Sequence, residues 1–281
     1  MTKLTVQLSR PFYFPGEMVE GQALLSAPKP VELRGISLQA EGCEHTSITV
    51  HHGKHSTTYV SRHDILQYSQ ALSGPCQLPS GDYSYPFRFQ LPPDALPTYK
   101  GYHANVRYNV MANADIPMWF DAKQTVEVPV VLPRRGIRPP QNLQGGLFRS
   151  ETADRPGRPA FQAKLSRLFF LAGETIEGTI SILSTGSKRL RKADVSLIAV
   201  ECAEAQGREA ENETPVAKCQ LPGEQLTDGV SSPFSLQIPP QVYSTYSGLH
   251  SSLAWVVRIN LDLAMAFDVS ADQQVAVVNA V

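Results

Sequence analysis

Apolar and polar residues alternate along several segments of this chain. The runs 106–112, 126–130 and 253–262 each place an apolar side chain at every second position. A period of two is the pattern of a half-buried β-strand, because successive strand side chains point to opposite faces. No stretch of comparable length carries the i, i+3, i+4, i+7 spacing of an amphipathic helix. The pattern therefore predicts an all-β protein.

Two parts of the sequence resemble each other. Residues 8–21 (LSRPFYFPGEMVEG) and 165–178 (LSRLFFLAGETIEG) are identical at eight of fourteen positions. Further along, 86–103 and 233–250 are identical at nine of eighteen positions. Similarity at a fixed offset indicates an internal repeat, in which one structural unit occurs twice in the chain. We therefore predict two tandem antiparallel β-sandwich domains of immunoglobulin-like type.

Composition places the boundary between the two copies. Residues 134–159 contain six arginines against two acids, with several prolines and glycines. Such a segment is typical of a linker, either a solvated connection or a contact for an anionic lipid or an acidic partner. The predicted organisation is an N-terminal sandwich at 1–133, a linker at 134–159 and a C-terminal sandwich at 160–281. A length of 281 residues suits two such domains.

Charge and cysteine content narrow the class of protein. The formal net charge is −1, which argues against a dedicated nucleic-acid binder. Four cysteines are too few for a secreted disulfide framework. The most apolar late segment, 253–267, is interrupted by Arg258 and Asp262, so it does not read as a membrane span. With no signal peptide at the start, the sequence indicates a cytoplasmic protein.

Two sets of polar residues recur in both copies. Glu17 and Glu20 could be paired catalytic carboxylates, but a spacing of three along a strand places them on opposite faces. Their recurrence favours a structural role at a turn. His103 and His250 each follow a Tyr-x-Gly turn, which favours hydrogen bonding over catalysis. We predict no catalytic residue, no cofactor and no enzymatic activity.

A histidine-rich tract is the best candidate for a functional site. Five of the seven histidines lie within 45–63, and Gly53 predicts the tip of a hairpin between strands 47–51 and 57–62. The second copy lacks this tract, so the fold that the two copies share does not require it. The tract is therefore a specialised feature of the first copy. The candidate partner-contact residues are His51, His52, His55, Tyr59 and His63.

Two other interpretations of the tract remain open. It could be an exposed hairpin with ordinary histidines or a pH-sensitive surface. Neutral imidazole also binds transition metals. The metal-ligand candidates are His51, His52, His55 and His63. No cysteine or acid accompanies them at a recognised ligand spacing.

The order of several motifs resembles that of a known family. The sequence reads PGExVEG, LRGISLQxEG, LPSGDYSYPFxFxLP and PTYKGYHxxVRYxVxA in turn. This order is similar to that of the arrestin superfamily, especially the arrestin-domain-containing, α-arrestin-like proteins. The resemblance implies arrestin-type sandwiches and a non-enzymatic adaptor or scaffold. Its implied partners are cytoplasmic segments of membrane proteins and trafficking or signalling proteins, with peripheral recruitment to membranes. It also implies that the region of the hairpin engages partners.

The chain departs from the α-arrestin pattern near its end. The proline pairs lack the tyrosine of a PPxY motif, and the sequence stops at Val281. We therefore expect a tail-less, minimal form. Lys3 and Arg10 are the only basic residues on the first strand, so binding of phosphorylated receptors is not expected. An alternative function is a bacterial sporulation-control-like regulator, or a metal- or pH-responsive regulator that uses the hairpin 45–63.

Overall fold

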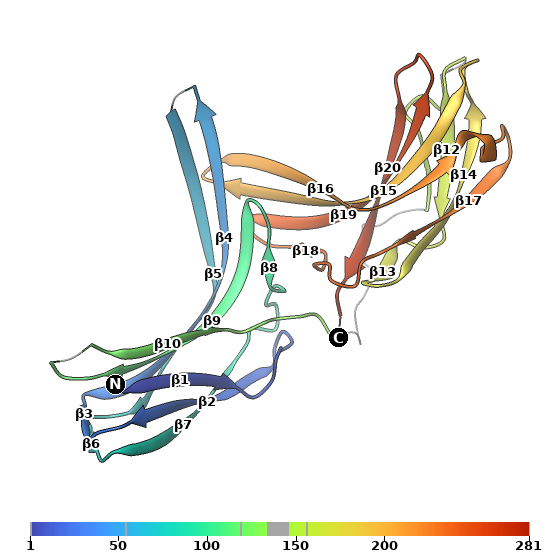
Figure 1. Cartoon of the computed structure of the whole chain (residues 1–281). Coiled ribbons are helices and arrows are strands. Elements are labelled where there is room, and N and C mark those ends of the chain that lie inside the picture. The colour runs from blue at the N-terminus through green and yellow to red at the C-terminus, as the bar shows by residue number, and fades with distance from the viewer. Residues whose placement is uncertain (1, 54, 119, 134–145, 156, 281) are drawn as a thin grey trace. The chain divides into compact units, whose positions relative to one another are not determined.

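The computed structural model describes residues 2–53, 55–118, 120–133, 146–155 and 157–280 (Figure 1). Nearly all of the regular structure in these ranges is β-strand, which confirms the predicted all-β fold. The single helical element among them is a 3-10 turn, η1 (Gly223–Gln225). None of the described residues forms a helix that could cross a membrane.

The chain divides into two compact units. Unit 1 consists of Met1–Leu132, Ala203–Ala210 and Ser247–Ser251. Unit 2 consists of Pro133–Cys202, Glu211–Tyr246 and Ser252–Val281. This division cuts across the expected range 160–281, because two short segments within that range group with unit 1.

Unit 1 contains the first ten strands. They are β1 (Lys3–Leu8), β2 (Met18–Ala27), β3 (Val31–Leu33), β4 (Gly35–His52), β5 (His55–Ser73), β6 (Cys76–Leu78), β7 (Gly81–Gln90), β8 (Tyr99–Lys100), β9 (Ala104–Asp115) and β10 (Ala122–Glu127). One sheet has the order β1-β2-β7, and a second has the order β10-β9-β4-β5 with β8 beside β9. The predicted alternation over 106–112 falls on β9, which buries every second side chain.

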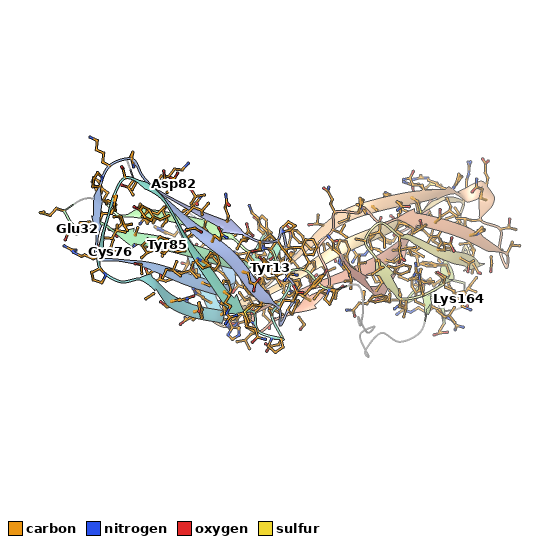
Figure 2. The ribbon with its side chains drawn as sticks, turned by 90° about the horizontal axis from the view of Figure 1, so that it is seen from below. Tyr13, Glu32, Cys76, Asp82, Tyr85 and Lys164 are labelled. Carbon is orange, nitrogen blue, oxygen red and sulfur yellow. The ribbon has the colours of Figure 1, made fainter. Side chains whose placement is uncertain are left out.

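The two sheets of unit 1 pack face to face. Every second residue of β2 is buried, and the ring of Tyr68 on β5 lies 5.6 Å from the ring of Phe89 on β7. At one end β3 pairs with β6, and Figure 2 shows Glu32, Cys76 and Tyr85 there. Burial raises the pKa of the Tyr85 phenol. The apolar area removed from water between the sheets is the main force that holds the sandwich together.

Unit 2 contains the remaining strands, except for those of their residues that lie within 203–210 and 247–251. They are β11 (Leu147–Arg149), β12 (Ala160–Leu165), β13 (Phe169–Leu171), β14 (Thr175–Ser184), β15 (Leu190–Ala205), β16 (Arg208–Pro222), β17 (Ser231–Gln237), β18 (Tyr246–Ser247), β19 (Ser251–Leu263) and β20 (Val269–Val278). One sheet has the order β11-β12-β14-β17, and the other has the order β13-β20-β19-β15-β16. β12 pairs antiparallel with β11 and β14, β14 pairs antiparallel with β17, and β19 pairs antiparallel with β20. β13 pairs parallel with β20.

The segment expected to be a linker contains a strand. Residues 147–149 form β11, which pairs antiparallel with β12 and buries Phe148. The expected connection over 134–159 therefore includes a strand at this point. The proline, glycine and arginine content of this segment concealed a short strand whose Phe148 side chain joins the core. Residues 134–145 and 156 of the expected linker lie outside the described residues.

A turn with the same contacts occurs in both units. Glu17 accepts a hydrogen bond on Oε2 from the backbone N–H of Phe14 at 2.9 Å. In unit 2, Glu174 accepts one on Oε2 from the backbone N–H of Leu171 at 2.8 Å. Gly16 lies between Phe14 and Glu17 in the sequence and has φ 79°, a left-handed conformation that glycine adopts without steric cost. Glu17 therefore stabilises a turn through this hydrogen bond, which is the structural role expected from its recurrence.

Each core also contains one large aromatic residue whose polar atom is satisfied. The hydroxyl of Tyr108 on β9 donates to the carbonyl of Leu96 at 2.8 Å, and burial raises the pKa of this phenol. In unit 2 the indole Nε1–H of Trp255 donates to the carbonyl of Tyr243 at 3.2 Å. Buried tyrosine and tryptophan usually find such partners, because an unpaired polar group would be costly.

Candidate functional site

The histidine-rich tract lies on a long β-hairpin. β4 and β5 pair antiparallel from Ile36 opposite Ser73 to His52 opposite His55, with register shifts after Ile36 and Gly42. Gly53 at the tip has φ 62°. β4 has β9 on its other side, whereas β5 is the end strand of its sheet. The side chains at 51, 52 and 55 are exposed. The structure therefore places the tract at the edge and tip of a sheet.

The strand register separates the candidate residues into two groups. His52 lies opposite His55, whereas His51 lies opposite Ser56. Because strand side chains alternate between faces, His51 points to one face and His52 to the other. The candidates that share a face are His52, His55, Tyr59 and His63.

The four histidines considered for metal binding do not converge. His51 is on the opposite face from the rest, and His55 is eight residues from His63 on the same strand. At roughly 3.3 Å per residue this separation is about 26 Å, far beyond the reach of one ion. The described residues contain no group of three or more His, Cys, Asp or Glu side chains that could hold a metal. His52 and His55 alone remain paired across the hairpin.

The base of the hairpin is covered by other parts of unit 1. Thr46 donates from Oγ1 to the carbonyl of Glu204 at 2.6 Å. Arg208 places its guanidinium 5.4 Å from the centroid of the Tyr59 ring, a cation–π geometry. Tyr59 is therefore partly covered by the segment 203–210, and the outer end of the hairpin carries the more accessible candidates.

A buried carboxylate near this base is the main feature that the sequence analysis missed. Glu44 on β4 is fully buried. It accepts hydrogen bonds from the backbone N–H of Leu249 at 3.0 Å, the N–H of His250 at 3.1 Å and the hydroxyl of Ser251 at 2.6 Å. The carboxylate also leaves no room for a side chain at Gly248. Glu44 thus holds the segment 247–251 within unit 1.

A sequence signal for Glu44 exists in retrospect. The backbone N–H of Ser47 donates to the carbonyl of His103, and that of Glu204 donates to the carbonyl of His250. Counting back three residues from each donor gives Glu44 and Glu201, and both are buried. The offset between these two acids equals the offset between the repeated segments 8–21 and 165–178. Both copies therefore have an acid at a position of a strand that faces inward. Because a buried charge needs hydrogen-bond partners, such an acid indicates a carboxylate with a structural role.

The two repeated histidines take part in hydrogen bonding. The carbonyl of His103 accepts from Ser47, as described above. His250 places Nδ1 2.9 Å from Oε2 of Glu204. The N–H of Gly207 and then His250 lower the pKa of the Glu204 carboxyl. These contacts agree with the hydrogen-bonding role expected from their position after a turn.

His45 provides a test of pH dependence in this region. Burial first, and then the positive charges of Arg107 and Arg62, lower the pKa of His45 below its usual 6.5. Between the lowered pKa and 6.5 the unfolded chain binds a proton that the folded chain does not, so stability falls as pH falls. We expect the urea midpoint to drop between about pH 7.5 and about pH 5.5, and to drop less in His45→Asn. An equal drop in both proteins would contradict this assignment.

The geometry defines a pair of β-sandwiches with a long hairpin that is partly covered and partly exposed. Residues 3–134 match the family model described as the arrestin (or S-antigen) N-terminal domain. Arrestin domain-containing protein 4 of Mus musculus is 31% identical over 136 residues, which are 44% of this chain and 33% of that protein. Arrestin domain-containing protein 1 of Mus musculus is 26% identical over 115 residues, 41% of this chain and 26% of that protein.

A third relative matches over a longer range. Arrestin domain-containing protein A of Dictyostelium discoideum is 22% identical over 303 residues, 95% of this chain and 50% of that protein. The matches span between about a quarter and a half of the length of these curated relatives. The match of residues 3–134 to this family model, together with these relatives, supports membership of the arrestin family.

Proposed function

We propose that the protein is a non-enzymatic adaptor or scaffold of arrestin type in the cytoplasm. It binds other proteins, among them cytoplasmic segments of membrane proteins and components of trafficking or signalling. The relatives named above support an adaptor role in general terms. The contact surface in this proposal is the outer part of the β4–β5 hairpin, with His51, His52 and His55 at its tip.

The position of β5 is the observation that carries this proposal. β5 has nineteen residues and lies at the end of its sheet, and most of its side chains are exposed or half-buried. An end strand has backbone N–H and C=O groups that can pair with an extended peptide, and side chains beside them can select its sequence. Such binding needs no catalytic group. A hairpin with a covered base and an exposed tip also provides a rigid platform for it.

A shortened hairpin tests the contact surface. Ile48 lies opposite Tyr59 in the register, so replacing residues 49–58 with Asn-Gly joins this pair by a two-residue turn. The change keeps the buried Thr46 and Ile48 in place, which deletion of the whole tract would not. We expect affinity capture with quantitative mass spectrometry to recover partners with the intact protein and to lose at least one of them with the shortened one.

Two controls make this experiment decisive. The shortened protein should keep the thermal unfolding midpoint of the intact protein within a few degrees, since the removed residues are mostly exposed. Paired variants at the tip, His51→Ser against His52→Ser with His55→Ser, then identify which face binds. Recovery of the same partners in the same amounts by a folded, shortened protein would refute the hairpin as the contact surface.

A further inference from the structure

The outer edge of β5 is contacted at one place by another segment of unit 1. This segment, 203–210, belongs to the same unit, and its turn at Gln206 meets β5 in two hydrogen bonds. The side-chain Nε2–H of Gln206 donates to the carbonyl of Val60 at 3.0 Å. The backbone N–H of Gln206 donates to Oγ of Ser61 at 3.2 Å. The turn therefore contacts β5 at two consecutive residues.

The carbonyl of Val60 is one of the groups that an added strand would use. Val60 lies opposite Ser47 of β4. The backbone N–H of Ser47 donates to the carbonyl of His103, on the side of β4 that faces away from β5. In an antiparallel ladder, two opposite residues turn their N–H and C=O groups either both toward each other or both away. The polar groups of Val60 therefore point outward from the sheet, and so do those of Thr58 two residues nearer the tip.

The Gln206 side chain takes the place of one N–H group of such a strand. A side-chain amide has the same kind of donor as a peptide bond, and the distance of 3.0 Å to the carbonyl oxygen of Val60 is that of an ordinary N–H···O hydrogen bond. An added strand would lie about 4.8 Å from β5, along the same edge. It would therefore pass through the space that the side chain of Gln206 fills.

The backbone of this turn gives an independent reason to assign a role to Gln206. β15 ends at Ala205 and β16 begins at Arg208, so Gln206 and Gly207 form a two-residue turn with φ 52° and 76°. Positive φ at both positions defines a type I′ turn, in which asparagine, aspartate or glycine is the usual first residue. Glutamine lacks the short polar group that eases a left-handed conformation. Its reach to β5, rather than the turn itself, therefore accounts for this residue.

The contact is one that a peptide can displace. Gln206 is exposed, and Val60 is 40% exposed. A hydrogen bond between neutral groups at such a place contributes little net free energy, because water competes for both partners. The segment itself is held separately, since Thr46 donates from Oγ1 to the carbonyl of Glu204 at 2.6 Å. The side chain of Gln206 can therefore leave the edge while the segment stays in unit 1.

We propose that Gln206 is a displaceable cap on the β5 edge, which an extended peptide segment of a partner protein removes when it pairs with β5. This inference rests on the adaptor function proposed above and adds the regulation of its contact surface. The cap reduces the apparent affinity for the peptide in proportion to the fraction of molecules in which the edge is open. It also sets the register, because the peptide N–H that replaces Nε2 of Gln206 lies at Val60 and the rest of the peptide runs past Thr58.

Two variants of the full chain remove the cap by different means. Gln206→Glu keeps the shape of the side chain but has no N–H to donate, and Gln206→Asn keeps the amide but is too short to reach Val60. The probe is a fluorescent synthetic peptide with the sequence of the partner segment that cross-links to a photo-reactive residue at position 58. We expect each variant to bind this peptide about two- to tenfold more tightly than the wild type, the factor that one neutral hydrogen bond corresponds to.

The control makes the same change of charge at an exposed glutamine of unit 2. Gln241→Glu should bind the peptide like the wild type. Hydrogen exchange at the amide of residue 206 should be faster in Gln206→Glu, and unchanged exchange would overturn the cap. Equal peptide affinities of the wild type and both variants would overturn the cap alone and leave the hairpin as the contact surface. If the shortened hairpin loses no partner, the adaptor surface fails and the cap fails with it, so the two failures are distinguishable.

Discussion

Replacing Glu44 with alanine is expected to cost about 3 kcal/mol of unfolding free energy. The change leaves the N–H groups of Leu249 and His250 without their acceptor and creates a cavity where the buried Glu44 side chain was. Urea unfolding measures the loss. Hydrogen exchange gives a local check, because the amides of these two residues should lose protection before the amides of β9 do.

The Glu44→Gln variant separates hydrogen bonding from shape. It keeps the size of the side chain but has one acceptor oxygen instead of two, and its NH₂ group would face an N–H donor. We expect it to fall between the wild type and Glu44→Ala in stability. Unchanged exchange at positions 249 and 250 in Glu44→Ala would show that the carboxylate does not hold this segment.

Replacing Gly21 or Gly178 with alanine is expected to destabilise the protein by about 1–3 kcal/mol. A Cβ at Gly21 would collide with the carbonyl oxygen of Gln7 and would lie 2.5 Å from the ring of Phe87. At Gly178 it would lie 2.7 Å from the carbonyl oxygen of Lys164 and 2.5 Å from the ring of Phe234. The backbone oxygens cannot swing away as a flexible side chain could.

Gly74→Ala is the matched control for these two variants. A Cβ there would meet nothing within 4 Å, and Gly74 does not have a positive φ. Its thermal unfolding midpoint should stay close to that of the wild type. We infer that the rings of Phe87 and Phe234 pack directly on glycine backbone that has no side chain. This inference fails if Gly21→Ala is as stable as Gly74→Ala.

Much of the fold follows from local sequence. The alternation over 106–112 predicts β9, and the run 253–262 predicts most of β19, because period-two burial is a property of each strand by itself. Gly53 marks the hairpin tip for the same local reason. β11 was missed because three residues with one buried side chain, Phe148, give too short a pattern to read.

The candidate site was predicted less completely. The tract 45–63 does lie on an exposed hairpin, but its histidines fall on two faces, and one of the chosen residues, Tyr59, is partly covered by Arg208. The exposure of the apolar segment 117–120 was not predicted either. Pro117 to Phe120 looks like core material in composition, and only the exposure of Met118 and Phe120 distinguishes a presented side chain from a buried one.

The sequence by itself determined the strands, the turns between them and the resemblance of the two halves, since these depend on neighbouring residues. The tertiary structure decided what each face of a strand meets. Glu44 is held by Leu249, 205 residues later in the chain, and no local pattern encodes such a pairing. The division of the chain into units, the covered base of the β4–β5 hairpin and the exposure of Met118 and Phe120 depend in the same way on the arrangement of distant segments.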